Sequence, residues 1–176
     1  DFISLAVLIA FVGALVILRV RQTKEVPATI SHSVASSPNS SLAFSLIMTV
    51  FFPLYYCFLW FWLGPYISAP TIFYVLLVVA FLAELIFVWA PASGRTKRIH
   101  SVSAAFVGLT MILASIIIFE AGDSVSDAAR ISIILFWLIT VVTALSFLKR
   151  YRKHTFIAEL LFCFAFLAMI SIVAHT

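Results

Sequence analysis

Long apolar stretches alternate with polar turns along the whole 176-residue chain. Each stretch is long enough to cross a hydrocarbon core of roughly 30 Å as an α-helix. Most of the prolines and nearly all of the charged residues lie in the turns, where helices end. The pattern therefore predicts six membrane-crossing helices, over residues 2–18, 42–63, 71–90, 100–119, 131–148 and 155–174.

The lengths of the turns predict how these helices pack. Only the connection after the first span is long, and short turns make consecutive helices antiparallel neighbours. We therefore predict an all-α fold in which residues 1–176 form a single transmembrane helical domain, a bundle of six helices. Residues 2–18 lack a basic leading segment and a small-residue cleavage site, so this stretch is predicted as a span rather than a signal peptide.

Three local features refine this prediction. Pro53 lies inside the second span and is expected to kink it. Ser126 or Asp127 is a suitable N-cap for a fifth helix that begins slightly before residue 131. Ala104 and Gly108 share one face of the fourth span, where small residues let helix backbones approach closely; ordinary packing is the alternative interpretation.

The composition supports a membrane protein and excludes a nucleic-acid-binding one. Hydrophobic residues make up 64% of the chain and charged residues only 10%, whereas soluble domains are about half apolar and about a quarter charged. The net charge of +4 comes from residues in the turns, which is where membrane topology places them. The expected partners are membrane lipids, with another membrane protein as an alternative, and no nucleic acid.

The basic residues also predict the orientation in the membrane. Ten of the eleven Lys and Arg residues lie in the turns over residues 19–41, 91–99 and 149–154. The positive-inside rule makes these turns cytoplasmic, which for a bacterial protein means the plasma or inner membrane. The opposite side holds an external charge cluster of Asp123, Asp127 and Arg130, in which Arg130 is expected to pair with either aspartate. Asn39, in an N-glycosylation sequon, is then cytoplasmic and unmodified.

Four ionisable residues are candidates for a polar layer just below the cytoplasmic surface. Glu84 lies about 10 Å from the end of its predicted helix and Glu159 about 7 Å from the start of its own. His100 and His154 begin the fourth and sixth spans on the same side. Carboxylates at membrane depth are costly, so they are expected to face the interior of the bundle and a partner there.

Three interpretations of this layer remain open. The residues form hydrogen bonds between helices and fix the packing, or they form a proton relay, substrate or lipid-headgroup site, or they bind a metal ion or haem. No HxxxH, HExxH or paired-carboxylate spacing supports the third, so no metal or cofactor is predicted. Cys57 and Cys163 lie inside predicted spans and are read as small buried residues.

The sequence contains no catalytic signature, such as a Ser/His/Asp set, a glycine-rich phosphate loop or a lysine inside a span. Whether the chain is an enzyme is therefore left open. The first functional hypothesis is a non-enzymatic membrane factor that binds lipid or a partner membrane protein. The alternative is a small transporter or membrane enzyme that uses Glu84, His100 and Glu159, which requires a pocket between the third, fourth and sixth spans.

The third to sixth spans resemble the six-helix DRAM/Sfk-type family, which includes the post-attachment remodelling factor for GPI anchors. The resemblance covers about half of the chain and rests on Glu84, on RIHSVSAAF at 98–106, on Arg130 and on AELLFC at 158–163. It implies an integral membrane factor of lipid handling or membrane trafficking without established catalytic machinery. Family members place the loop after the first span on the non-cytoplasmic side, whereas the charges here predict the opposite.

Overall fold

The computed structural model describes residues 13, 38–90, 94–148 and 155–175, and within these ranges the regular elements are all helices. Five are long: α3 (Pro38–Phe58), α5 (Thr71–Trp89), α6 (Lys97–Phe119), α7 (Asp127–Ser146) and α8 (Thr155–His175). Four are short: the π-helix η1 (Leu59–Leu63), α4 (Gly64–Tyr66), and the 3-10 turns η2 (Gly94–Thr96) and η3 (Gly122–Ser124).

Five helical segments are long and apolar enough to cross a membrane, and the first of them joins α3, η1 and α4 over Ser41–Tyr66. They match the spans predicted over 42–63, 71–90, 100–119, 131–148 and 155–174 to within a few residues. The predicted span 2–18 lies outside the described residues. The all-α fold and five helices long and apolar enough to span a membrane are therefore confirmed, whereas the integral membrane bundle of six spans stays a prediction.

One boundary differs from the prediction, because α3 already begins at Pro38. Residues 38–41 were expected to belong to the preceding loop. Proline suits the first position of a helix, since the backbone N–H that it lacks would have no partner there. Asn39 therefore lies in the first turn of α3.

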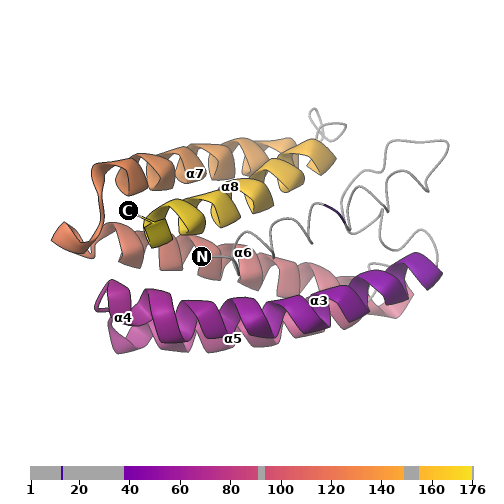
Figure 1. Ribbon diagram of the computed structural model, residues 1–176. Coiled ribbons are helices and arrows are strands. Elements are labelled where there is room, and N and C mark those ends of the chain that lie inside the picture. Colours follow the sequence, from indigo (N-terminus) through magenta and orange to yellow (C-terminus); the bar gives the residue numbers. More distant parts are fainter. Residues whose placement is uncertain (1–12, 14–37, 91–93, 149–154, 176) are drawn as a thin grey trace.

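The long helices alternate in direction and form a bundle (Figure 1). α5 pairs closely with α6, α7 pairs closely with α8, and α3 packs along α5. The starts of α3, α6 and α8 lie at one end, which we call the basic end because Arg95, Lys97 and Arg98 are exposed there. The other end, with exposed Glu120 and Asp127, is called the acidic end.

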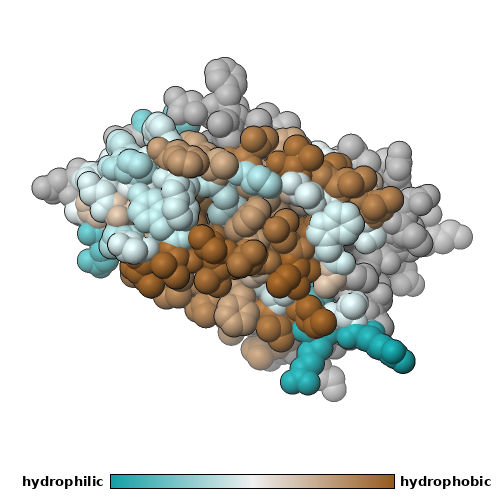
Figure 2. Space-filling model, turned by 90° about the horizontal axis from the view of Figure 1, so that it is seen from below, coloured by the Kyte–Doolittle hydropathy of each residue, from teal (hydrophilic) through white to brown (hydrophobic). Residues whose placement is uncertain are grey.

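The outer surface of the bundle is as apolar as its core. Only 28% to 33% of the residues in each candidate span are buried inside the structure, so most of every apolar helix faces outward. Figure 2, which views the molecule from the side of α3 and α5, shows this face as broadly hydrophobic. A soluble protein rarely exposes apolar area on this scale, so the surface fits a lipid environment.

Polar side chains join α3 to α5 near the basic end. The Ser45 hydroxyl donates to the Val88 carbonyl at 2.8 Å. The indole N–H of Trp89 donates to the Thr49 hydroxyl at 3.0 Å. In hydrocarbon these groups have no water to bond to, so the pairing fixes the register of the two helices.

Similar bonds connect α6, α7 and α8. The Trp137 indole donates to the Ser115 hydroxyl at 2.8 Å and so joins α7 to α6. The Thr155 hydroxyl donates to the Ser146 carbonyl at 2.8 Å, which satisfies a free carbonyl at the end of α7. Each bond replaces a contact with water that the membrane cannot supply.

The predictions of local structure have mixed outcomes. Ser126 is the N-cap of α7, because its hydroxyl accepts from the Ala129 N–H at 3.2 Å, and the helix begins at Asp127, four residues before the predicted span. Pro53 lies inside α3, which continues for five more residues to Phe58. The π-helical turn η1 then begins at Leu59. A Cβ built on Gly108 meets no atom within 4 Å, which favours the interpretation of ordinary packing over that of a close helix approach.

Two glycines give a matched test of the packing. A Cβ at Gly64 would lie 2.6 Å from the Tyr74 hydroxyl oxygen and 2.8 Å from its ring, whereas Gly108 is open. Gly64→Ala is expected to lower the free energy of unfolding by about 1–3 kcal/mol through overpacking. Gly108→Ala should leave it unchanged or raise it by up to about 1 kcal/mol, because alanine favours helix. Thermal unfolding of the purified variants in detergent measures both; equal midpoints would contradict the packing around Tyr74.

Candidate functional site

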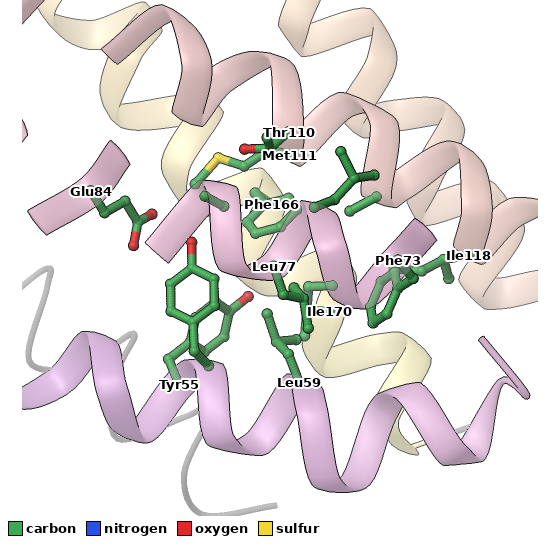
Figure 3. A pocket seen from close by; sticks show the side chains of 14 residues that line it. Tyr55, Leu59, Phe73, Leu77, Glu84, Thr110, Met111, Ile118, Phe166 and Ile170 are labelled. Atoms are coloured by element: carbon green, nitrogen blue, oxygen red, sulfur yellow. The ribbon is translucent and has the colours of Figure 1, made fainter. Parts of the chain in front are cut away.

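A small cavity lies between α3, α5, α6 and α8 (Figure 3). Its volume of about 20 Å³ is enough for one water molecule. Ten of the fourteen lining side chains are apolar, and the four with a carboxyl or hydroxyl group are Tyr55, Tyr56, Glu84 and Thr110. The cavity adjoins the third, fourth and sixth predicted spans and also the second, but of Glu84, His100 and Glu159 only Glu84 lines it, so the functional pocket stays a prediction.

Glu84 lies on α5, five residues before the helix ends at Trp89, and is only 5% exposed. Figure 3 shows its carboxyl group at one end of the cavity, with Tyr55 at the same end and Phe73 and Ile118 at the other. The Tyr56 hydroxyl is close enough to hydrogen-bond with this carboxyl group. The Glu84 Oε2 atom, however, has no hydrogen-bond partner among the described residues.

The two tyrosines are a part of the site that sequence reasoning missed. Tyr55 is 5% exposed and its hydroxyl, like Glu84 Oε2, has no hydrogen-bond partner. Trp60, Trp62 and Tyr66 near the end of the same span are exposed, as expected of an interfacial belt. The sequence did contain a signal for this part of the site. Tyr55 and Tyr56 lie more than one helical turn before Trp60, away from the end of the span, and a buried phenol usually needs a polar partner.

Thr110 contributes an oxygen to the cavity wall from α6. Its hydroxyl donates to the carbonyls of Phe106 and Val107 in the same helix, each at 2.9 Å. This back-bonding occupies the hydroxyl hydrogen. The Thr110 oxygen therefore faces its surroundings as an acceptor only.

His100 joins α6 to the end of α5. Its Nδ1 atom lies 2.7 Å from the Ala90 carbonyl oxygen and 3.1 Å from that of Phe87. Two carbonyl acceptors require a proton on Nδ1, so this nitrogen donates. The imidazole also packs on the Phe87 ring, with 4.4 Å between ring centroids. His100 thus satisfies the last carbonyls of α5, a common role of histidine at helix ends.

The predicted polar layer is therefore assembled only in part. The carbonyls bound by His100 belong to residues three and six positions beyond Glu84, which places them about 5 to 9 Å nearer the basic end along the helix axis. Glu159 is half-buried on α8, and both carboxyl groups lie within electrostatic range of Cys163. His154 lies outside the described residues.

The described part of the external charge cluster shows one hydrogen bond of Arg130, and its expected ion pair with an aspartate stays a prediction. The Nη2 atom of Arg130 donates to the Gly122 carbonyl at 2.8 Å. Gly122 has a φ of +66°, a backbone conformation that favours glycine. Asp127 is exposed in the first turn of α7, where a negative charge stabilises the helix dipole. The side chain of Asp123 lies outside what the structure describes.

Neither a metal-binding group of side chains nor a similar known protein adds to the description of this site. Within the described ranges, no group of three or more His, Cys, Asp and Glu side chains is placed to hold a metal ion. No family model matches the chain, and no curated protein or solved structure matches it. The functional argument therefore depends on the residues of this chain alone.

The role of His100 can be tested by substitution. His100→Phe keeps the ring contact with Phe87 and removes the hydrogen bond to the α5 carbonyls. We expect the free energy of unfolding to fall by about 1–3 kcal/mol, because buried carbonyls lose their donor. The matched control is His175→Phe, which should change the free energy of unfolding little, because His175 is exposed and water can replace its hydrogen bond with the Ser171 carbonyl. Equal stability of both variants in thermal unfolding would show that the histidine does not hold the helices together.

Proposed function

We propose that this chain is a six-span integral membrane protein that binds anionic phospholipid and has no catalytic activity. The observation that carries the proposal is an exposed apolar stripe on α6 that leads directly to three exposed cations. The resemblance to a family of lipid-handling membrane factors points in the same direction.

The stripe is formed by side chains that recur every three or four residues, and this spacing keeps them on one face of the helix. Its members, which we call the α6 stripe, are Ile99, Val102, Phe106, Leu109, Leu113 and Ile116, all exposed. A second exposed series on the paired helix α5 approaches the same end and consists of Val75, Val79, Leu82, Ile86 and Trp89. Acyl chains can lie against such parallel apolar ridges.

The cations are Arg95, Lys97 and Arg98, all exposed where α6 begins. Each Lys or Arg near an anionic membrane surface contributes about 1 kcal/mol of attraction. The positive dipole of the helix start adds to the attraction for a phosphate. The headgroup of one lipid molecule would therefore contact these cations, and its acyl chains would contact the α6 stripe, which follows directly in the sequence.

The internal cavity supports a role without catalysis. Its volume of about 20 Å³ admits one water molecule and neither a lipid nor a metabolite. Substrate binding of ordinary size needs a pocket of about 300–1,000 Å³. Among the described residues, the surface of the bundle, rather than this cavity, is therefore the place where a molecule as large as a lipid can bind.

The charge distribution supports a cytoplasmic basic end, at which the proposed lipid site faces the anionic inner leaflet. A second candidate function is proton or cation handling by a small transporter. One observation favours it: the Glu84 Oε2 atom is buried without a hydrogen-bond partner beside the cavity.

Lipid preference can be measured directly. The full chain is reconstituted in nanodiscs that contain mixed zwitterionic and anionic phospholipid, and the co-purified annular lipid is quantified. We expect enrichment of anionic lipid, and a loss of roughly tenfold or more in that preference in the triple variant Arg95→Gln, Lys97→Gln, Arg98→Gln, at about 1 kcal/mol per cation. Glu120→Gln, an exposed charge at the acidic end, is the matched control and should retain the preference.

Two results would contradict the lipid proposal. One is the same lipid composition around the wild type and the triple variant. The other is a specific membrane protein crosslinked to the α6 stripe in native membranes, with anionic lipid excluded from it. The second result would favour the alternative of a partner-binding factor.

The orientation has its own test, because the two ends carry matched exposed positions. In a background of Cys57→Ser and Cys163→Ser, single cysteines are introduced as Arg98→Cys at the basic end and Glu120→Cys at the acidic end. A membrane-impermeant maleimide added to intact cells should label the second and spare the first, because the basic end is retained inside. The reverse labelling, or a glycan on Asn39 in a eukaryotic host, would show the opposite orientation.

A further inference from the structure

Two buried polar atoms without hydrogen-bond partners belong to the wall of the same cavity. They are Glu84 Oε2 on α5 and the Tyr55 hydroxyl oxygen on α3. Leaving one buried polar atom unpaired costs about 1–3 kcal/mol, and more for a charged group. Their coincidence on facing helices, at one end of a shared cavity (Figure 3), points to a ligand that bonds to both.

The size of the cavity limits what that ligand is. A buried water needs about 10–15 Å³ and two to four polar partners, and this cavity measures about 20 Å³. Leu77, Ala80 and Phe166 are among the apolar residues that enclose it. An apolar occupant would leave both polar atoms unpaired, so the chemistry of the site selects a small hydrogen-bonding molecule.

We propose that Glu84 and Tyr55 bind one water molecule inside the membrane-spanning bundle. The water donates one hydrogen to Glu84 Oε2 and accepts the hydroxyl hydrogen of Tyr55. Its second hydrogen has an acceptor in the Thr110 oxygen, because the Thr110 hydrogen is engaged by the carbonyls of its own helix. The Tyr56 hydroxyl interacts with the same carboxyl group and holds its orientation.

Water fits this donor set better than a metal ion does. Glu84 is the only carboxylate among the cavity-lining residues, and its remaining polar neighbours are hydroxyl groups. Divalent cations with oxygen ligands take six or more oxygens, several of them from carboxylates or carbonyls. The bound water makes Glu84 a hydrated carboxyl group in an otherwise apolar interior, and this conclusion does not depend on lipid binding at the surface.

The methionines of the chain provide an internal comparison for the test. Met111 lines the cavity and is half-buried, whereas Met48 and Met169 are buried elsewhere, at 2% and 1% exposure, so variants are needed to assign Met111 oxidation to the cavity. Radiolytic footprinting produces hydroxyl radicals from bound water, and these oxidise side chains next to it. With the full chain in nanodiscs, mass spectrometry should find Met111 oxidised well above Met48 and Met169.

Two variants test whether the oxidation of Met111 depends on the proposed water. Tyr55→Phe and Glu84→Leu each remove one hydrogen-bond partner and should reduce Met111 oxidation below that of the wild type. Tyr55→Phe is the conservative change, because it keeps the ring and removes only the hydroxyl group, and it decides if Glu84→Leu fails to fold.

Three results would overturn the proposal. Oxidation of Met111 no greater than that of Met48 and Met169 would mean a dry cavity. Equal Met111 oxidation in wild type and both variants would mean that the radicals come from another source, such as water at the membrane surface. Loss of Met111 oxidation on exchange of potassium for sodium would mean that a cation, and not water, occupies the site.

Discussion

Inside a bilayer, every polar group must find its partner within the protein, and this constraint organises the described bundle. Each pair of consecutive long helices shares at least one side-chain hydrogen bond. Ser45 bonds α3 to α5, His100 bonds α6 to α5, Trp137 bonds α7 to α6, and Thr155 bonds α8 to α7. Lipid is as apolar as the core, so burial of hydrocarbon gives little preference between packings. The polar bonds therefore set which helices meet and in which register.

The cavity lies where the bundle closes on itself. There α8 meets α3, α5 and α6 through apolar side chains such as Phe166 and Ile170. Glu84 and Tyr55 stand out at this closure, because their free polar atoms are not matched by the protein as those of Ser45 and Trp137 are. An ionisable residue at membrane depth is expensive and marks functional sites in membrane proteins. The proposed lipid site at the surface and the polar site in the interior are thus separate features, one at the basic end and one within the bundle.

Much of the fold follows from the sequence, because apolar length and charged turns are local properties. The positions of α5 to α8 and the cap at Ser126 were predictable for this reason. The position of Glu84 beside Tyr55 and Tyr56 was not predictable, since it depends on how α3 is rotated against α5, and a π-helical turn lies at the end of α3. The sequence suggested His100 as a partner for Glu84. In the structure, His100 donates instead to the backbone carbonyls at the end of α5. The sequence alone does not show that these carbonyls compete with Glu84 for the histidine.

The central claim is that Glu84 and Tyr55 share one polar site across the α3–α5 interface. A double-mutant cycle with Tyr55→Phe and Glu84→Gln, measured by unfolding of the full chain in bicelles, tests it most directly. If the two groups act together, directly or through a bound water, the cycle should give an interaction free energy of about 0.5–3 kcal/mol. Effects that add to within about 0.3–0.5 kcal/mol would show that the two residues are independent and would contradict the account.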